Sequence, residues 1–494
     1  MADSKKMEAL EKRPPIVVVM GHVDHGKSTL IDYIRKSNIV AKEAGGITQA
    51  IGAYEIEHKN ASGLVQKITF IDTPGHNAFG AMRARGAKVA DVAVLVVAAD
   101  DGVKLQTKEA VKCIKEAEIP FVVAINKADL PAADIEKTKS DLLQAEIFLE
   151  GMGGDISWQI ISAKTGKGVS ELLDLILLTA EMEELSFDPK GETRGVILTG
   201  RRDSRRGVIV GLVVKNGALK KGQYIAASNA GGKLKLLEDG NGKAIKTLLP
   251  SAPALVIGFE TIPSVGEEFV SGDDEKKIAA FITRPDVVKP SIQRKEEERE
   301  EAIFVVLKAD EAGSLMALKN IAEKIAAETP LSIVEASVGD IIENTVKNAP
   351  IKNGIIIGFR SKVEMVAKKM AEIRGVPIIT SDVIYDLEDS ISKYLKENKK
   401  KEPPALEVLA VFGTPKKKEQ VVGGMVRSGI VKNRAGFLVL RDDKEVGKGK
   451  IKNLQSGKND VSEVSEGKEA GLLIEADLPV VKGDKLVFGN KEGI

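Results

Sequence analysis

Short apolar runs alternate with helix-like stretches between residues 14 and 187. The apolar runs cover residues 16–20, 67–71, 92–98, 121–125 and 159–161. Between them, residues 28–36 and 106–117 carry apolar side chains at helical spacing. Buried strands that alternate with helices are typical of a mostly parallel sheet with helices on both faces. We therefore predict an α/β domain over residues 14–187.

The pattern changes at Asp188-Pro189. From there to residue 285, short β-rich runs are separated by glycine-containing turns, a spacing that is typical of a small β-barrel. A highly charged stretch over residues 286–300 predicts a linker. Alternating apolar runs and an amphipathic stretch then return over residues 301–381, which predicts a second, smaller α/β domain.

One helix and another β-rich segment complete the chain. Residues 382–402 predict a long linking helix, because apolar side chains recur at helical spacing at Val383, Ile384, Leu387, Ile391 and Leu395. The helix should end at Pro403-Pro404. Residues 403–494 are β-rich, and residues 425–432 resemble residues 213–220, with a glycine at the same place in both segments. This similarity favours two related barrels.

Length and composition agree with a multidomain α/β and β protein. A chain of 494 residues is too long for one hydrophobic core, and its 43% of hydrophobic residues is ordinary for globular domains. A net charge of +1 neither indicates nor excludes a nucleic-acid partner, which would have to meet local basic patches.

Cysteine usage and the chain's start bear on the compartment. The single cysteine, Cys113, rules out an intramolecular disulfide and suits a reducing compartment. One cysteine and four scattered histidines do not predict a zinc site. Residues 1–13 form a charged leader without a signal-peptide core, and no apolar run is long enough to span a membrane. We predict a cytoplasmic protein.

A glycine-rich loop lies between the first predicted strand and the first predicted helix. Gly21-His22-Val23-Asp24-His25-Gly26-Lys27-Ser28 has the spacing of a phosphate-binding P-loop. Its glycines let backbone N–H groups curl around phosphate oxygens, and the following helix N-terminus, with Thr29, favours negative charge. Lys27 is placed to reach the β- and γ-phosphates, and Ser28 to ligate Mg²⁺. An ordinary glycine-rich turn is the structural alternative.

A second motif, Asp72-Thr73-Pro74-Gly75, follows the predicted strand 67–71. A carboxylate at the C-terminal end of such a strand lies beside the P-loop and can hold the Mg²⁺ shell. The Gly75 N–H can sense the γ-phosphate. Alone, the tetrapeptide is equally consistent with an ordinary turn.

Asn126-Lys127-Ala128-Asp129, after the predicted strand 121–125, carries the group that selects the base. The Asp129 carboxylate can accept from guanine N1–H and its exocyclic amine, whereas adenine lacks this donor pair and would leave a buried acceptor unpaired. Ser162-Ala163-Lys164, after strand 159–161, can offer a backbone N–H to guanine O6. Each string is weak alone, but all four occur in the required order, each after a predicted strand. We therefore predict binding of GTP and GDP.

Details of these motifs resemble the translational GTPases, in which a histidine, here His76, follows the Asp-Thr-Pro-Gly element. Strings at residues 44–53, 81–87 and 98–107 are similar to bacterial translation initiation factor two in particular. Outside the GTP-binding domain, the resemblance continues at 308–314, 337–339, 356–359 and 383–387, and it covers about residues 14–488. It implies the order G domain, β-barrel, α/β domain, long helix, β-barrel.

The resemblance implies roles that spacing alone does not assign. Thr48 is expected to close on the nucleotide, with its hydroxyl and carbonyl near Mg²⁺ and the γ-phosphate. His76 is expected to orient or polarise the attacking water once ribosomal RNA holds it in place, with a surface histidine beside a turn as the alternative. Asp24 is either a ligand of a monovalent cation near the β-phosphate or a residue that only shapes the loop.

The resemblance also implies an activity and partners. The activity is ribosome-stimulated hydrolysis of GTP to GDP and phosphate, which promotes initiator tRNA binding and subunit joining and drives release of the factor. The partners are both ribosomal subunits with their RNA, and initiator methionyl-tRNA, formylated in bacteria. We expect a monomer that does not bind membranes.

Two features depart from the usual family pattern. Bacterial members carry a long charged extension before the G domain, in place of a short leader. The last domain of the family binds the acylated end of initiator tRNA with a cysteine in its first strand, a basic-aromatic-basic cluster and a Glu-Cys-Gly element. The corresponding places here read Gly424, Gln455-Ser456-Gly457 and Glu469-Ala470-Gly471, and Lys458 is retained. The barrel is expected, but the strictness of formyl-methionine recognition is open.

Two other functions are alternatives. An elongator-type carrier of aminoacyl-tRNA places two barrels directly after the G domain, whereas here an α/β unit intervenes. A GTP-regulated scaffold for ribosome assembly, without appreciable turnover, is disfavoured by His76 and the Thr48 segment. The lysine tracts at 399–401 and 416–418 are interpreted as solvated charge, with a contact to ribosomal RNA as the alternative.

Overall fold

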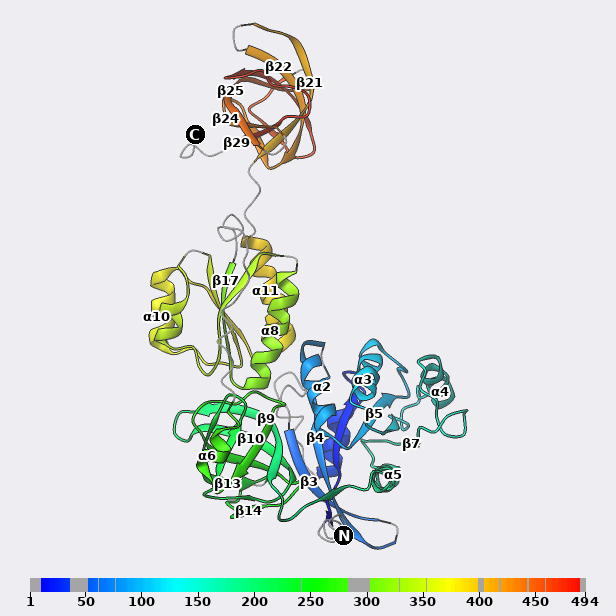
Figure 1. The fold of residues 1–494 in the computed structure, drawn as a ribbon. Coiled ribbons are helices and arrows are strands. Elements are labelled where there is room, and N and C mark those ends of the chain that lie inside the picture. The colour runs from blue at the N-terminus through cyan, green and yellow to red at the C-terminus, as the bar shows by residue number, and fades with distance from the viewer. Residues whose placement is uncertain are drawn as a thin grey trace, which may run out of the picture. The chain divides into compact units, whose positions relative to one another are not determined.

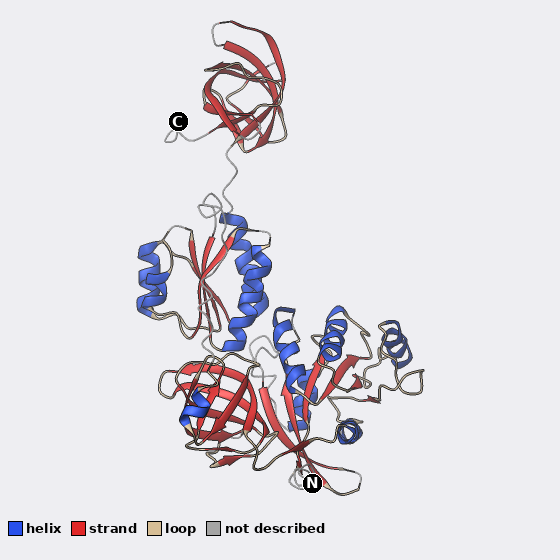
Figure 2. Ribbon diagram, viewed as in Figure 1, coloured by secondary structure: helices blue, strands red, loops and turns tan. Residues whose placement is uncertain are grey.

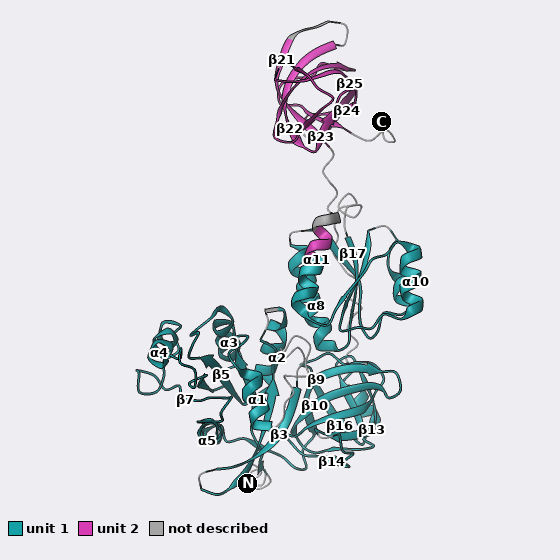
Figure 3. Cartoon of the chain, turned by 180° about the vertical axis from the view of Figure 1, so that it is seen from behind, with its two compact units in different colours: residues 1–391 teal, residues 392–494 magenta. Residues whose placement is uncertain are grey.

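The computed structural model (Figure 1) describes residues 10–35, 52–60, 62–75, 77–240, 242–282, 303–327, 329–351, 353–398, 404–416, 419–441, 444–457 and 459–488. The chain forms two compact units, residues 1–391 and residues 392–494, which we describe separately (Figure 3). Among the described residues, no helix combines the length and the apolar character needed to cross a membrane.

The first domain is built on a six-stranded sheet in the order β3-β4-β2-β5-β6-β7. The strands are β2 (Ile16–Gly21), β3 (Gly52–Lys59), β4 (Val65–Asp72), β5 (Val92–Ala98), β6 (Phe121–Asn126) and β7 (Trp158–Ile160). All neighbours are parallel except β3 and β4. The predicted parallel strands are confirmed; β3 was not predicted.

Helices cover both faces of this sheet, as predicted (Figure 2). They are α1 (Lys27–Arg35), α2 (Gly80–Val89), α3 (Leu105–Glu116), α4 (Ile135–Gln144) and α5 (Val169–Met182), with a short 3₁₀ helix η4 (Asn77–Phe79) before α2. Val17 and Val19 belong to the core cluster that includes α1 and α5. Val18 points to the other face, where Gly86 of α2 lies so close that a Cβ there would be 3.4 Å from Val18 Cγ2. The alternation of side chains along β2 therefore supplies both cores.

The end of the segment predicted as a leader is part of this fold. Strand β1 (Glu11–Lys12) pairs with β8 (Ser186–Phe187). Arg13 forms a two-pronged ion pair with Asp91, at 2.6 and 2.7 Å. Both side chains are nearly buried, so the described leader residues fasten the start of the domain to its end.

The second domain is a closed barrel in the order β10-β15-β13-β12-β16-β9. Its strands are β9 (Thr193–Asp203), β10 (Gly207–Asn216), β12 (Tyr224–Ala227), β13 (Gly231–Asp239), β15 (Pro253–Phe259) and β16 (Glu268–Gly272). A side ribbon pairs β11 (Leu219–Lys220) with β14 (Thr247–Leu248). Helix α6 (Glu275–Ala279) follows, capped by Asp274. The predicted linker 286–300 lies outside the described residues.

The third domain is the predicted second α/β unit. Its four parallel strands run in the order β18-β17-β19-β20, with β17 (Ile303–Ala309), β18 (Leu331–Val338), β19 (Gly354–Phe359) and β20 (Ile378–Ser381). Its helices are α8 (Ala312–Ala326), α9 (Glu343–Asn348) and α10 (Met365–Arg374). The predicted linking helix is α11 (Ile384–Asn398), which buries Ile384, Leu387 and Ile391. Figure 2 shows α10 on the opposite side of the sheet from α8 and α11.

The second unit contains the predicted C-terminal barrel. Its main sheet has the order β24-β29-β21-β22-β28-β25-β26, and pairing of β24 with β25 closes it. The strands are β21 (Ala405–Lys416), β22 (Glu419–Ser428), β24 (Gly436–Arg441), β25 (Lys444–Ser456), β26 (Asn459–Asp460), β28 (Glu469–Ala476) and β29 (Lys485–Phe488). A side ribbon pairs β23 (Ile430–Lys432) with β27 (Glu463–Ser465). The two similar segments each form a strand, a left-handed glycine (Gly217 or Gly429) and the first strand of a side ribbon.

Candidate functional site

The P-loop is held by two close backbone approaches. Gly21 ends β2 with φ 144°, and a Cβ there would lie 2.3 Å from the backbone oxygen of Val96. Gly26 has φ 87°, and a Cβ would lie 2.3 Å from Nδ2 of Asn126. Only glycine fits at either position, so the loop can curl tightly between β2 and α1. This is the cradle that phosphate oxygens require.

Lys27 lies at the centre of the phosphate side of the site. Its side chain is buried, and Nζ donates to the backbone oxygen of His22 at 2.5 Å. Burial lowers the pKa of Lys27 to about 8, and the carboxylate of Asp72 opposes this shift. A Cβ on Gly75 would lie 2.7 Å from Lys27 Nζ, so the predicted γ-phosphate sensor borders the lysine that is expected to bind the same phosphate.

The end of β4 supplies oxygen ligands next to the P-loop. Asp72 is the last residue of β4 and pairs in register with Val19 of β2. The Thr73 hydroxyl donates to the Val19 carbonyl at 2.9 Å, which fixes the turn that follows. Ser28 stands in the first turn of α1, where the P-loop ends. A hydroxyl and a carboxylate are donors that suit Mg²⁺.

The base side of the site is tied directly to the P-loop. Asn126 donates from Nδ2 to the His25 carbonyl at 2.9 Å and accepts from the Ala163 N–H at Oδ1, also at 2.9 Å. Because Asn126 is buried, this one side chain joins the P-loop, β6 and the 162–164 loop.

Asp129 is exposed at the edge of the site and ready to meet a ligand. It accepts a hydrogen bond from the Ser162 hydroxyl at 2.7 Å, and this bond lowers the pKa of its carboxyl group. Lys127 has φ 62° and pairs with Asp100 at 3.3 Å, whereas Lys164 is exposed. The four predicted motifs therefore meet at one edge of the sheet.

Two residues outside the four motifs, Arg83 and Gln106, support the site from neighbouring helices. Arg83 of α2 is buried and donates to the carbonyls of Pro74 and Gly75, at 3.3 and 3.1 Å, while its other nitrogen pairs with Glu109 at 3.0 Å. Gln106 accepts from the Val23 N–H at 3.0 Å. An arginine within an otherwise apolar helix face was the available signal for the first; nothing in the sequence singles out the second.

The structure describes only some of the residues that were predicted to be functional. Thr48, His76 and Lys458 lie outside the described residues, as do the tracts 399–401 and 417–418. In the C-terminal barrel, Gly424 and Ala470 are direct partners in the β22–β28 pairing. Gly423 and Gly471 are partners next to them, and Gln455 pairs with Gly471. The positions singled out from the sequence therefore do lie together.

This fold and this site define a P-loop domain that binds a guanine nucleotide. The profile of the elongation factor Tu GTP-binding domain matches residues 12–182, that of elongation factor G domain 2 matches residues 192–272, and that of translation-initiation factor 2 matches residues 284–392. The translation initiation factor IF-2 of Thermus thermophilus is 39% identical over 506 residues, covering 98% of this chain and 88% of the relative. The chain belongs to the translation initiation factor IF-2 family.

Other relatives agree with this assignment. The IF-2 proteins of Thermotoga sp. and Nitratiruptor sp. are each 40% identical and match 98% of this chain, and the matches cover 72% and 59% of those relatives. A solved structure, GDP-bound aIF5B from Aeropyrum pernix, aligns over 97% of this chain and 92% of that chain with 26% identity and a TM-score of 0.49.

Proposed function

We propose that the protein is a ribosome-stimulated GTPase of translation initiation, which promotes binding of initiator tRNA and joining of the ribosomal subunits. The observation that carries the proposal is the Asn126 bridge between the P-loop and the base-side loop. It unites a phosphate cradle and an exposed carboxylate into one nucleotide site, in a chain that belongs to the IF-2 family. GTP hydrolysis then releases the factor.

Each side of the nucleotide has a proposed set of contacts. Backbone N–H groups of the P-loop bind the α- and β-phosphates, and Lys27 binds the β- and γ-phosphates. The exposed carboxylate of Asp129, which accepts from Ser162, is available to guanine, and Ala163 follows Ser162 directly. Gly75 borders Lys27, so its N–H reports whether the γ-phosphate is present.

Hydrolysis is proposed to proceed by in-line attack of water on the γ-phosphorus. The water oxygen forms a bond to phosphorus, the bond to the β–γ bridging oxygen breaks, and the products are GDP and phosphate. Catalysis comes from positioning and electrostatics. Lys27 offers positive charge to the leaving GDP oxygens, Thr48 closes over the γ-phosphate, and His76 orients the water when ribosomal RNA holds it in place.

Oxygen atoms of the site are the proposed ligands of its metal ions. Ser28, Thr48 and Asp72 would hold Mg²⁺, which would supply positive charge to neutralise the phosphates. Asp24 is exposed at the tip of the P-loop with φ 61°, a geometry that permits both earlier interpretations, cation ligand and loop-shaping residue.

Helix α2 connects the site to the rest of the first unit. Arg85 donates to the Val265 carbonyl of the first barrel at 2.6 Å. A Cβ on Gly313 of α8 would lie 2.3 Å from Met82 Cε, and Asn320 of α8 donates to the Ala78 carbonyl at 3.2 Å. Movement of the 72–75 turn on loss of the γ-phosphate would therefore be felt by both neighbouring domains.

The proposed partners are both ribosomal subunits with their RNA, and initiator methionyl-tRNA in its formylated form. Action on ribosomes places the protein in the cytoplasm, and we propose that it works as a monomer. An elongator-type function is not favoured, because the described α/β domain intervenes between the two barrels.

GTP turnover tests the proposal. Phosphate release is measured with each isolated subunit, with both subunits together, and with initiator or elongator tRNA added. We expect stimulation only when both subunits are present, and faster subunit joining with initiator tRNA alone. Equal effects of all aminoacyl-tRNAs would indicate an elongator-type carrier, and a lack of stimulation by ribosomes would indicate the scaffold alternative.

A further inference from the structure

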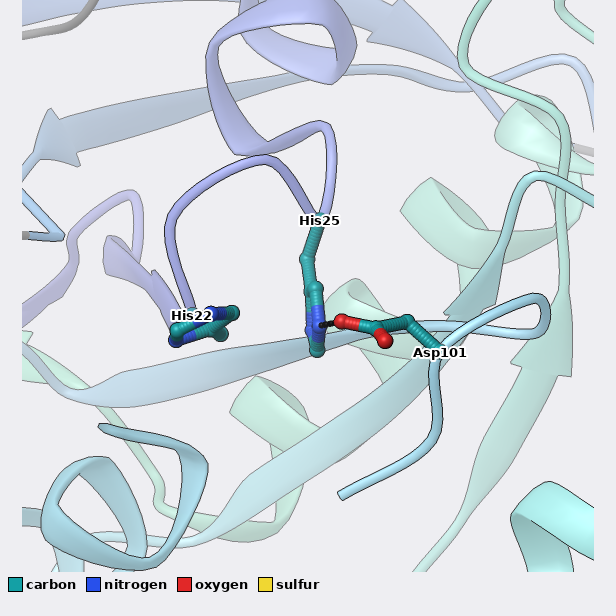
Figure 4. Close-up of side chains that lie close together, drawn as sticks. All are labelled: His22, His25 and Asp101. Atoms are coloured by element: carbon teal, nitrogen blue, oxygen red, sulfur yellow. Dashed lines mark hydrogen bonds and ion pairs between the residues drawn. The ribbon is translucent and has the colours of Figure 1, made fainter. Parts of the chain in front are cut away.

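Two histidines of the P-loop and one aspartate gather on the side of the loop that faces α3. His22 and His25 come from the P-loop, and Asp101 comes from the turn between β5 and α3. Figure 4 shows the two imidazole rings near each other under the loop, with the Asp101 carboxylate close to His25. The ring centroids are 5.0 Å apart. One ligand atom from each of the three residues lies within 4.8 Å of the others.

Both rings have unused nitrogen atoms. His25 is 1% exposed, and its Nδ1 has no hydrogen-bond partner in the described part of the chain; the same holds for Nδ1 of His22. Nε2 of His25 stands 3.4 Å from an Asp101 oxygen, which is long for a hydrogen bond. A buried ring nitrogen without a hydrogen-bond partner needs an explanation, and here there are two side by side.

The backbone that carries the two rings is fixed from outside the cluster. Asn126 holds the His25 carbonyl at 2.9 Å, and Gln106 holds the Val23 N–H at 3.0 Å. Asp101 is steered by Lys104, whose Nζ lies 2.7 Å from the other carboxylate oxygen. The rings are therefore presented by a loop whose position is set by other contacts, as a binding site requires.

We propose that His22, His25 and Asp101 bind a transition-metal ion such as Zn²⁺, at a site separate from the Mg²⁺ site. Two neutral imidazole nitrogens and one carboxylate oxygen, with water in the fourth position, form a tetrahedral set that suits this ion. Bonds of about 2.0–2.2 Å place tetrahedral ligand atoms about 3.4 Å apart, which is the separation of His25 Nε2 and the Asp101 oxygen. Only the His22 ring has to approach. Composition alone did not predict a metal site of this kind.

The bound ion would act on the nucleotide through the loop. His22 and His25 flank Val23 and Asp24, so an ion that ties both histidines to Asp101 clamps the P-loop onto the turn after β5. We expect release of the nucleotide to involve movement of the P-loop. The metal site would therefore slow release of GDP, while Mg²⁺, which prefers oxygen donors, would not compete for the two imidazoles. This consequence rests on the proposed nucleotide site; binding of the ion does not.

Cobalt(II) tests the site on the full chain. Protein is titrated with CoCl₂ in the presence of GDP and excess Mg²⁺, and the visible absorption of tetrahedral cobalt is followed. We expect one ion per chain, displaced by Zn²⁺. Asp101→Asn and His22→Gln should each weaken binding by more than about tenfold, since even changes behind the ligands cost 10–100-fold. Loss of GDP binding in either variant would show a damaged fold, so GDP affinity is measured alongside.

Matched controls separate this site from other ligands. His58 and Asp174 form another histidine–aspartate pair, at 2.8 Å, and His58→Gln should leave cobalt binding unchanged. Cys113→Ser should do the same. Lys104→Gln should tighten binding, because it removes the cation that competes for Asp101. The proposal is overturned if no cobalt binds, if Asp101→Asn and His22→Gln bind it normally, or if a cobalt–thiolate band appears.

The dissociation rate of a fluorescent GDP analogue tests the clamp separately. We expect added Zn²⁺ to slow release of the GDP analogue from the wild-type protein severalfold. The release rate from Asp101→Asn should be the same with and without Zn²⁺. If the metal binds but does not change the rate of GDP release, the metal site stands and the proposed clamp on the P-loop is wrong. Failure to bind GDP at all would instead overturn the proposed function.

Discussion

Arg83 donates from its buried guanidinium to the carbonyl of Gly75, the residue that borders Lys27 of the P-loop. The distance is 3.1 Å, and a second bond to Pro74 measures 3.3 Å. Only 2% of Arg83 is exposed, and Glu109 of α3 holds its far side at 3.0 Å. The turn that we propose to sense the γ-phosphate is thus anchored by a side chain of α2, the helix that contacts both neighbouring domains.

Arg83→Met should weaken discrimination between GTP and GDP. Without the guanidinium, the 74–75 carbonyls lose their donors and the Gly75 N–H is no longer fixed toward the γ-phosphate. Loss of buried hydrogen bonds of this kind costs about 1–3 kcal/mol, so GTP affinity should fall roughly 5- to 150-fold relative to GDP affinity. Equilibrium binding of both nucleotides measures this ratio. Arg85→Met is the control, because Arg85 contacts Val265 instead; an equal loss in both variants would contradict a specific role for Arg83.

Lys27 should make GTP binding pH-dependent above neutrality. Burial lowers the pKa of Lys27 to about 8, and bound phosphates would raise it again because they favour the charged form. Between these two pKa values binding takes up a proton, so GTP affinity should fall with rising pH, by at most about tenfold per unit. Calorimetry at about pH 8.5 in two buffers of different ionisation enthalpy measures the proton uptake. Lys27→Arg stays charged and should show none; equal uptake in both proteins would assign the proton elsewhere.

Asp129→Asn should change the preferred base. The carboxylate accepts from guanine, whereas an amide can donate to the additional oxygen of xanthine. Preference should shift from GTP toward XTP, measured by competition binding. Asp134 is a suitable control because it caps α4 through the Lys137 N–H, and Asn can keep that cap. Unchanged preference for GTP in Asp129→Asn would falsify the assignment.

The sequence was sufficient to predict which segments gather at the P-loop, because each motif is a short local string that follows a buried strand. Gly21 and Gly26 stand at positions where an added Cβ would lie 2.3 Å from a neighbouring atom, so that only glycine fits there. The same locality explains why the two related barrels were recognised: a strand, a left-handed glycine and a short ribbon recur in order.

Features that depend on long-range packing were not predicted. Arg83 lies only eight positions from Gly75, but it reaches the 72–75 turn because α2 folds back over it, and its place in an apolar helix face was the signal along the chain. His22, His25 and Asp101 are separated by up to 79 positions, so only the β5–α3 turn brings them together. Strand β3 was missed because its alternating polar residues, such as Glu55 and Glu57, lack the apolar run of a central strand; it is an edge strand, where one face meets solvent.

His76→Ala should leave GTP binding and ribosome attachment nearly intact while slowing ribosome-stimulated hydrolysis by a few orders of magnitude. An imidazole that acts only in the transition state changes turnover without loosening ground-state binding. Single-turnover hydrolysis on joined ribosomes checks the expected loss of rate, and GTP affinity measured in parallel checks that binding is retained. A normal stimulated rate would mean that another group positions the water.

In the C-terminal barrel, the geometry around Gly424 explains part of the departure from the family pattern. A Cβ at Gly424 would lie 2.3 Å from the Glu407 carbonyl oxygen and 2.3 Å from Leu406 Cδ2. A cysteine therefore does not fit at this position without a shift of β21, whereas the partner Ala470 already carries a buried Cβ. Gln455 donates to Asp460 at 2.6 Å, so this side chain is already engaged within the domain.

We predict that the protein binds initiator tRNA but discriminates formylated from unformylated methionine less sharply than typical family members. Gly424 and Ala470 place no thiol at the strand pair, and Gln455-Ser456-Gly457 supplies neither the cation nor the aromatic ring. Each missing stacking or charge-assisted contact costs on the order of 1–3 kcal/mol. Affinities of the full chain for the two forms of the tRNA should differ less than about tenfold. Ala470→Cys should fold normally and Gly424→Cys should lower the melting temperature, which checks the register independently. A discrimination of about a hundredfold or more would show that other residues, such as Lys458 and Glu469, rebuild the pocket.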